Sequence, residues 1–207
     1  MELSHEQVLE IVTDEPFDFP PGTGWLYNNS GYYLLGMIIE RVSGRSYGDI
    51  IREEIVSPIG MRATRYGDIN PIIPNRARGY KMDASGEFLN ADPIGMNTPG
   101  TAGALVSTVV DMLRWQRALD EHQLVTSDAY TLMRTPAKLE DGTSTLYGFG
   151  LSIGTLEGRR TIYHGSGING FVSQLSRYPD DELTIVVLTN TMSSEAEIVE
   201  QAVARMI

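Results

Sequence analysis

The sequence predicts an α+β fold, because a mainly helical first part is followed by short strands and a final helix. In the first part, apolar residues recur at helical spacing, as at Tyr33, Leu34, Met37, Ile38 and Val42. After Gly142 the pattern changes to short β-rich runs separated by turn residues. We therefore expect one domain over 1–207, with a helical lobe at 1–140 and antiparallel strands with a terminal helix at 141–207.

The expected helices of the first part have recognisable start and stop signals. Ser4 and Gln7 have the spacing of a capping box, which opens the first helix. Gly44 stands where a left-handed residue would end the second helix, and Pro58 follows the end of the third. The expected helical spans are 4–13, 30–42, 46–56, 109–119 and 127–133.

The middle of the chain is the least regular part. Between 58 and 100, the content of Gly, Pro, Asn and Asp predicts turns and small hairpins around Tyr80 and Phe88. The segment 103–111 is interpreted as a glycine-bearing turn before a helix rather than as a catalytic motif. Ser107 is the expected cap of that helix, and Asp111 is expected to be exposed in its first turn.

Four strands and a helix are expected after Gly142. The runs are rich in β-branched and aromatic residues, and turn residues separate them. Residues 179–182 predict a hairpin turn between the last two strands. The expected strands are 147–153, 161–164, 171–178 and 183–189, and the closing helix is 195–206.

The composition disfavours or excludes several classes of function. The chain has 207 residues and a formal net charge of −11, with Lys81 and Lys138 as its only lysines. No basic stripe is present to neutralise a phosphate backbone, so no nucleic-acid partner is expected. There are no cysteines, which excludes disulfides and Cys-based zinc sites. No apolar run approaches the roughly 20 residues of a membrane span. Residues 1–4 lack the pattern of a signal peptide, and the compartment stays open.

The most informative segment is 20–31, where a Pro-Gly turn, two aromatic residues and a Tyr-x-Asn triplet directly precede a helix. One interpretation is structural, with Tyr27 as a half-buried core residue and Asn29 as a turn residue or helix cap. In the functional interpretation, a cationic neighbour lowers the pKa of Tyr27 and lets the phenol relay a proton. Asn29 then hydrogen-bonds a substrate amide.

A second candidate is His164, which glycines follow closely in the sequence. A lone histidine often has a structural role, but glycines at an expected strand end let a ligand approach the backbone. Free backbone N–H groups there would hold an oxyanion, while the imidazole binds a carboxylate or assists proton transfer. In the functional interpretation Tyr27 and His164 are catalytic, and the substrate-binding residues are Asn29, Gly165, Ser166 and Gly167; the structural interpretation stays open at this point.

Two other chemistries are disfavoured. Ser166 is a poor candidate nucleophile, because His164 and Ile168 occupy the outer glycine positions of a Gly-x-Ser-x-Gly elbow. No metal is expected, since His5, His122 and His164 are far apart and no carboxylate cluster accompanies them. No cofactor is expected either, because no phosphate-cradling loop precedes a helix.

Taken together, the motifs resemble the serine β-lactamase-like family, which includes class C β-lactamases, D-alanyl-D-alanine carboxypeptidases, esterases and D-aminopeptidases. Each motif is weak alone, but they follow the family's order along nearly the whole chain. The matching stretches are 21–36, 42–47, 57–64, 103–111, 164–171 and 178–190.

The resemblance implies a hydrolase that forms an acyl-enzyme on the serine of a Ser-x-x-Lys helix, acting on β-lactam, D-amino-acid peptide or ester bonds. It makes Tyr27 the base or proton relay, Asn29 the substrate anchor and His164 the residue of the third motif. Histidine at that position resembles the carboxypeptidase and esterase branches. Ser166 occupies the glycine position of the third motif, a departure that bears on the oxyanion geometry.

The nucleophile motif itself is not found in these 207 residues. Arg78 stands three residues before Lys81, and Thr135 precedes Lys138 in a proline-containing loop. The chain therefore resembles the C-terminal portion of such an enzyme, with the N-terminal strands of the sheet absent. Two functions are expected. One is a serine hydrolase completed by an N-terminal segment, upstream or on another chain. The other is a non-catalytic module that self-associates through an exposed sheet edge.

Overall fold

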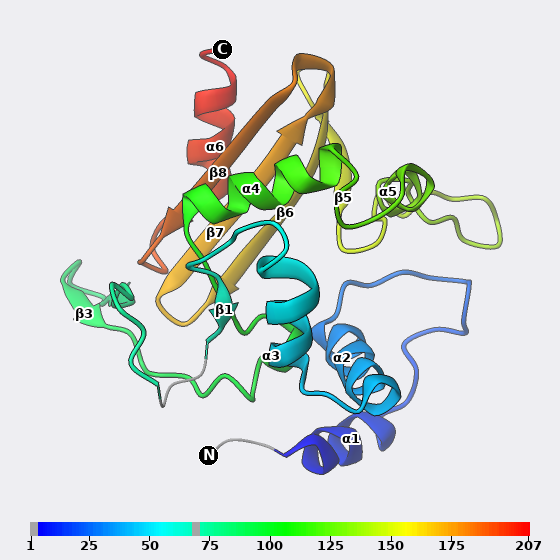
Figure 1. Ribbon diagram of the computed structural model, residues 1–207, viewed down its shortest axis with the longest axis horizontal. Helices are drawn as coiled ribbons and strands as arrows, with labels where there is room; N and C mark the ends of the chain where they lie inside the picture. Colours follow the sequence, from blue (N-terminus) through cyan, green and yellow to red (C-terminus); the bar gives the residue numbers. More distant parts are fainter. Residues whose placement is uncertain (1–3, 68–70) are drawn as a thin grey trace.

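The computed structural model describes residues 4–67 and 71–207 and has the expected α+β architecture (Figure 1). Its main sheet is antiparallel, with strands in the order β5-β6-β7-β8, so that consecutive strands are neighbours. The bounds of these strands are β5 Ser152–Leu156, β6 Arg159–Ile168, β7 Phe171–Tyr178 and β8 Leu183–Thr189. A 3₁₀ turn, η3 (Pro179–Asp181), joins the last two strands, which confirms the expected hairpin.

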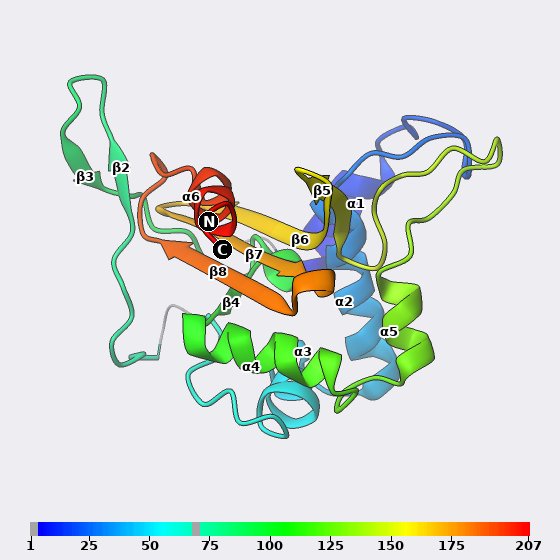
Figure 2. The same cartoon turned by 90° about the horizontal axis from the view of Figure 1, so that it is seen from above.

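Helices cover both faces of this sheet, as Figure 2 shows: α4 (Val109–Asp120) lies on one face and α6 (Ala196–Ala204) on the other. Side chains alternate between the two faces along each strand. On β7, the Arg177 guanidinium reaches Asp120 at the end of α4, with Nε and Oδ2 3.2 Å apart. Its neighbour Tyr178 points the other way and donates a hydrogen bond to Glu200 of α6. The sheet therefore presents two distinct surfaces, each under its own helix.

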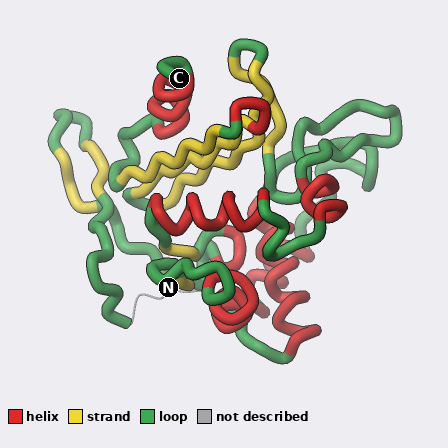
Figure 3. Tube along the Cα trace, turned by 45° about the horizontal axis from the view of Figure 1, so that its top comes forward, coloured by secondary structure: helices red, strands yellow, loops and turns green. Residues whose placement is uncertain are grey.

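The remaining helices belong to the first 140 residues and gather beside the sheet (Figure 3). They are α1 His5–Thr13, α2 Asn29–Ser43, α3 Tyr47–Ile50, the π-helical η1 Ile51–Val56, the 3₁₀ turn η2 Gly100–Ala102 and α5 Ser127–Met133. Two small antiparallel pairs complete the described fold. They are β1 (Arg65–Tyr66) with β4 (Leu105–Val106), and β2 (Tyr80–Met82) with β3 (Phe88–Asn90).

The helix signals of the first part are confirmed. Ser4 and Gln7 form the reciprocal capping box of α1. Gly44 ends α2 in the left-handed conformation, with φ of 68°. The expected helix 46–56 begins after its cap Ser46 but changes from α to π geometry at Ile51. In this π-helical half, Ile51 and Val56 are buried against Met61 and form a small core. The helix turns of this half are wider than those of an α-helix.

Two expectations around α4 are wrong. The cap of α4 is Thr108, whose hydroxyl accepts from the N–H of Asp111, whereas the Ser107 hydroxyl bonds that of Thr64. Asp111 is not exposed but 1% accessible. Its carboxylate accepts hydrogen bonds from the N–H of Ala63 at 2.8 Å and the hydroxyl of Thr64 at 3.0 Å. The Asp111 carboxylate therefore fixes the turn at 63–64 to the start of α4. This contact is long-range in the sequence, so no local pattern encodes it.

The first two expected strands differ from the observed ones. Residue 147 lies in a loop rather than in a strand, and β5 begins at Ser152. Residues 148–151 form a turn instead of a strand, closed by a hydrogen bond of 2.8 Å from the N–H of Gly148 to the carbonyl of Leu151. In contrast, β6 is longer than expected and continues through Gly165 and Gly167. The glycines after His164 thus lie inside a strand, where pairing with β7 needs only backbone groups.

Helix α2 is held in place by an unusually close contact with η2. The Thr101 hydroxyl donates to the carbonyl of Tyr32 at 2.8 Å, and a Cβ at Gly36 would overlap the Thr101 side chain. In the same turn of α2, the Tyr33 hydroxyl lies 3.1 Å from Nδ1 of His5 and ties α1 to α2. Because residues 25–32 lead into α2, this packing also fixes the position of the Tyr-x-Asn segment.

We predict that Asp111→Asn lowers the free energy of unfolding at neutral pH by about 1–3 kcal/mol, because it removes a buried hydrogen-bonded carboxylate. Burial alone raises the pKa of Asp111, but hydrogen bonds from Ala63, Arg114 and Thr64 outweigh it and lower the pKa below the ordinary value. Because the folded pKa is lowered, this stabilisation is present above the unfolded pKa and is lost as the pH falls through the folded pKa.

Urea denaturation between neutral and strongly acidic pH measures this effect. The difference between wild type and Asp111→Asn should shrink as the pH falls below the ordinary range of aspartate. The control is Asp18→Asn, which changes an exposed carboxylate for which no hydrogen bond or ion pair is present among the described residues. A pH-independent difference would contradict the assignment.

We predict that Gly36→Ala destabilises the fold by about 1–3 kcal/mol, because the new methyl group overpacks against Thr101. The matched control is Gly48→Ala in α3, where the nearest atom to the new Cβ is Tyr66 Cβ at 3.4 Å. That control should be neutral or stabilising, since alanine favours helix over glycine. Thermal unfolding of both variants measures the difference, and equal melting temperatures would argue against the close contact.

Candidate active site

The structure brings Tyr27 and His164 together, although they are far apart in the sequence. Tyr27 lies in the extended segment before α2, and His164 lies on β6. The centroids of their rings are 5.8 Å apart. The Asn28 side chain caps α2 by accepting a hydrogen bond of 2.8 Å from the N–H of Gly31. This cap fixes the backbone at Asn28, and with it the positions of its neighbours Tyr27 and Asn29.

The two ends of the Tyr-x-Asn triplet are bonded to each other. The Tyr27 hydroxyl donates to Oδ1 of Asn29 over 3.1 Å. The amide nitrogen of Asn29 has no acceptor among the described residues, so its two N–H groups are available to a ligand carbonyl. Tyr27 is 43% exposed, which leaves its hydroxyl accessible from the same side.

Another phenol, that of Tyr147, contacts His164, and the sequence interpretation missed it. The Tyr147 hydroxyl lies 3.2 Å from Nε2 of His164 and 3.1 Å from the Tyr32 hydroxyl. A chain of hydrogen bonds therefore runs from α2 through the loop before β5 to β6, and it fixes the orientation of the imidazole. No sequence signal could have found Tyr147, because its role depends on a loop that folds over α2.

Aromatic rings form the walls of the opening. A cavity of about 310 Å³ lies beside the start of α2. Its lining includes Trp25, Leu26, Tyr27, Tyr32, Leu35 and Tyr147. Asn29 and His164 are not among the residues that line it, so Tyr27 and Tyr147 connect this cavity to the imidazole.

The expectation that a cation lowers the pKa of Tyr27 is wrong for this chain. Burial raises the pKa of Tyr27, and the neighbouring Tyr32 adds to the effect. Burial, followed by the hydrogen bond with Tyr32, also raises the pKa of Tyr147. Neither cation–π contact in the described part of the chain involves either phenol. Both hydroxyls therefore keep their protons at neutral pH and act as hydrogen-bond donors.

The backbone after His164 is open along one edge of β6. Strand β5 pairs with β6 only as far as Tyr163, opposite Ser152, so 164–168 have β7 as their only strand partner within the described residues. Gly165, Ser166 and Gly167 are exposed. A side chain at Gly167 would meet open space, on the same face of β6 as Gly165 and opposite His164.

Gly165 has an additional, structural reason to be glycine. A Cβ there would come within 2.7 Å of Oε1 of Gln174, which lies across the strand on the face opposite His164. The Ser166 hydroxyl has no hydrogen-bond partner in the described part of the chain, so no base is placed to activate it as a nucleophile. Gly165 thus serves packing as well as access, which the sequence alone did not indicate.

The remaining expectations concern metals and membranes. Within residues 4–67 and 71–207, no group of three or more potential metal-ligating side chains comes together. Lys81 lies on the β2–β3 hairpin and pairs with Asp92 at 2.6 Å. Its ammonium is therefore engaged outside the aromatic cluster, which is formed by the rings of Trp25, Tyr27, Tyr32, Tyr147 and His164. No helix among the described residues is long and apolar enough to cross a membrane.

The family model for Beta-lactamase matches residues 2–206. The chain belongs to the beta-lactamase family. The match covers all the residues of the aromatic cluster, including Tyr27 and His164, and it confirms the resemblance found in the sequence motifs.

Two curated relatives and one solved structure in this family carry more specific names. Penicillin-binding protein 4* of Bacillus subtilis is 29% identical over 97% of this chain, which spans 47% of that relative. A D-aminopeptidase of Cereibacter sphaeroides is 31% identical over 85% of this chain, with 34% of the relative covered. A D-stereospecific amidohydrolase from Streptomyces sp. superposes with a TM-score of 0.84 at 25% identity, covering 98% of this chain and 61% of that structure. The chain thus spans less than two thirds of each of them.

We predict that Tyr27 titrates above the ordinary phenol value of 10.0, because burial raises its pKa in this chain. The measurement is a pH titration of phenolate absorbance for wild type and Tyr27→Phe, whose difference isolates the Tyr27 step. N-acetyltyrosine amide provides the reference value. A difference step at or below the reference would show that an unrecognised positive charge acts on the phenol.

Proposed function

We propose that this chain supplies the proton-transfer and substrate-binding part of a serine hydrolase that works through an acyl-enzyme. The observation that supports it is the approach of Tyr27 to His164 at 5.8 Å beside an aromatic cavity. In this proposal the nucleophilic serine and its lysine come from a Ser-x-x-Lys segment outside these 207 residues. The whole span 1–207 is then one domain fragment completed by that segment.

In the proposed reaction, the serine Oγ attacks the carbonyl carbon of the scissile bond and transfers its proton to a base beside it. The leaving amine or alcohol takes a proton as the bond breaks, and water then hydrolyses the ester to the serine. Tyr27 is the group placed to relay these protons. A lysine ammonium next to the phenol would stabilise the phenolate and lower the raised pKa of Tyr27 toward the working range.

The binding roles follow from the groups left free. The Asn29 amide N–H groups are free to anchor a substrate carbonyl, since its oxygen already accepts from Tyr27. His164, oriented by Tyr147, is placed to bind a substrate carboxylate or assist proton transfer. The open edge at Gly165, Ser166 and Gly167 offers backbone groups to an extended substrate and to the oxyanion.

For the substrate class, we propose an amide or peptide bond next to a D-amino acid in preference to an ester or a β-lactam. The names of two similar proteins, a D-aminopeptidase and a D-stereospecific amidohydrolase, support this order. The aromatic lining of the cavity supports an apolar side chain on that amino acid.

A second function, a non-catalytic module that self-associates, is favoured by the exposed apolar stripe on α2. Leu35, Ile38 and Val42 lie on one helix face and are 53%, 56% and 82% exposed. Apolar residues gathered in this way mark surfaces that bind another chain or segment. The sheet edge at β8 is also open among the described strands, which offers a second route to association.

We predict that the isolated chain hydrolyses neither D-alanine p-nitroanilide nor a chromogenic β-lactam, and that a Ser-x-x-Lys segment from a family member restores activity. Within the complemented enzyme, Tyr27→Phe should lower kcat by about 10²–10⁴-fold, because it removes only the proton-relaying oxygen. Tyr80→Phe in β2, away from the aromatic cluster, is the matched control.

The readouts are kcat and the acyl adduct detected by mass spectrometry. An adduct on a serine of the isolated chain would overturn the proposed division of the site. Unchanged kcat in Tyr27→Phe would return that residue to a structural role. Concentration-dependent sedimentation without recovered activity would favour the self-associating module instead.

A further inference from the structure

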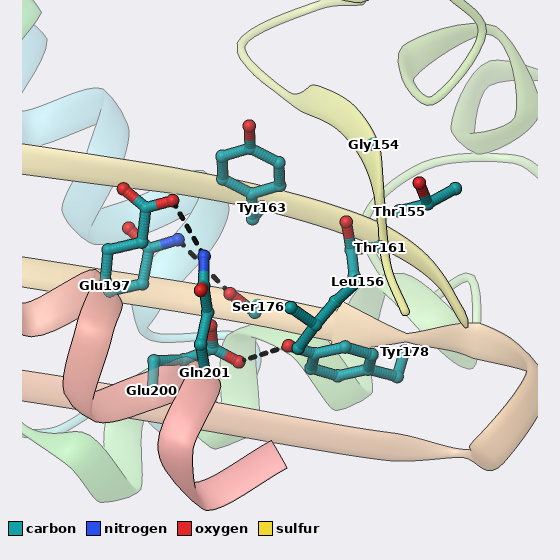
Figure 4. A pocket seen from close by; sticks show the side chains of 11 residues that line it. Gly154, Thr155, Leu156, Thr161, Tyr163, Ser176, Tyr178, Glu197, Glu200 and Gln201 are labelled. Carbon is teal, nitrogen blue, oxygen red and sulfur yellow. Dashed lines mark hydrogen bonds between the residues drawn. The ribbon is translucent and has the colours of Figure 1, made fainter. Parts of the chain in front are cut away.

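A second cavity lies on the face of the sheet opposite His164, beneath α6 (Figure 4). Its volume is about 150 Å³. Polar side chains dominate its lining. They are Thr161 and Tyr163 of β6, Gln174 and Ser176 of β7, and Glu197 and Glu200 of α6. The cavity is separate from the proposed hydrolase site, because consecutive residues on β6 point to opposite faces of the sheet.

Glu200 is a buried carboxylate without a cation. It is 2% accessible, and one of its oxygens accepts a hydrogen bond of 2.8 Å from the Tyr178 hydroxyl. Its second oxygen has no donor among the described residues. Two arginines act on Tyr178 but form no ion pair with Glu200. Arg159 lies over the Tyr178 ring at 4.9 Å and pairs with Asp181, and Arg205 pairs with Glu157, each pair at 2.8 Å.

Gln174 adds a second acceptor that has no donor among the described residues and, like the free Glu200 oxygen, is reached from the open cavity. Its side chain is 5% accessible, and its amide nitrogen donates to the hydroxyl of Ser176 over 3.2 Å. The amide oxygen has no hydrogen-bond donor in the described part of the chain, and it lies above Gly165, where a side chain would displace it. Tyr163 of β6, Ser176 of β7 and Glu200 of α6 line the same cavity, and Figure 4 shows the hydrogen bond from the Tyr178 hydroxyl to Glu200.

The chemistry of these groups selects the kind of ligand. A carboxylate oxygen and an amide oxygen only accept hydrogen bonds, so their partner must be a donor. A carboxylate forms its strongest hydrogen bonds with charged donors, which makes a positively charged donor the favoured partner. A cavity of about 150 Å³ holds a molecule as large as benzene, so a small amine fits.

We propose that this cavity binds a primary alkylammonium group, held by Glu200 and Gln174. The three N–H groups of an ammonium match the carboxylate oxygen, the amide oxygen and one of the hydroxyls of Ser176, Thr161 or Tyr163. The ligand is either a free small amine or the side chain of a lysine in another polypeptide segment. This site is independent of the proposed hydrolase activity, since it uses none of the same residues.

The test is an NMR titration of the 207-residue chain with methylammonium chloride, followed through the backbone amides of Gly165, Gln174 and Gln201. Tetramethylammonium chloride is the matched ligand, because it has the same charge but no N–H donor. We expect saturable shifts with methylammonium and none with tetramethylammonium. Equal shifts with both salts, or none with either, would overturn the proposal.

Variants locate the binding. Glu200→Gln keeps the shape and the acceptor for Tyr178 but removes the charge, and it should weaken methylammonium binding by about tenfold, since charge-assisted hydrogen bonds are the strong ones. Glu10→Gln, an exposed change on α1, should leave affinity unchanged. Gln174→Met removes the amide oxygen and should also weaken binding, which keeps the test decisive if Glu200→Gln unfolds. Equal affinity in wild type, Glu200→Gln and Gln174→Met would exclude this site.

A second ligand distinguishes the two sources of the ammonium group. Nα-acetyl-lysine methylamide presents the same group on a longer stem. If it shifts the same amides and loses affinity in Glu200→Gln, the cavity accepts a lysine side chain of another segment. If methylammonium alone binds, the cavity is a site for free small amines. Both results support the ammonium site.

Discussion

The pairing of β6 with β7 is the constraint on which the rest of the structure depends. It holds β6 extended through Gly165 and Gly167, where the side chains themselves give no reason for a strand. Because successive residues of a strand point to opposite faces, this pairing directs His164 to the aromatic cluster and its neighbours to the cavity under α6. One strand therefore contributes residues both to the aromatic cluster and to the cavity under α6.

Within the described residues, no lysine or arginine lines either the cavity beside α2 or the cavity under α6. Around Tyr27, burial and neighbouring phenols favour the protonated hydroxyl, so an ionised phenol requires a cation from outside the cluster. Under α6, Glu200 is buried with one hydrogen bond and no counterion among the described residues. The chain has a net charge of −11, and several of its cations pair with exposed carboxylates, among them Arg45, Arg52, Lys81 and Arg117.

Packing in the first part of the chain serves to position the aromatic cluster. The close contact of Gly36 with Thr101 fixes α2, and the Asn28 cap fixes the segment that carries Tyr27. The Tyr32–Tyr147–His164 hydrogen bonds then connect this segment to the sheet. These contacts join parts of the chain that are far apart in sequence, so the geometry of the cluster depends on the whole helical part packing correctly against the strands.

The sequence by itself determined features that local signals carry. The capping box at Ser4, the left-handed end at Gly44, and the strands 171–178 and 183–189 were predicted correctly, because caps and period-two patterns act over a few residues. Family resemblance added the pairing of Tyr27 with His164, whose catalytic roles stay predictions.

Only the tertiary structure decided which polar groups are buried. Asp111 was expected at the surface and is buried, Tyr147 was expected in a strand and bonds His164 from a loop, and Glu200 is enclosed on an otherwise ordinary terminal helix. Each depends on partners contributed by distant segments. The burial and protonation of a single side chain are set by what packs against it, and no pattern within its own element contains that information.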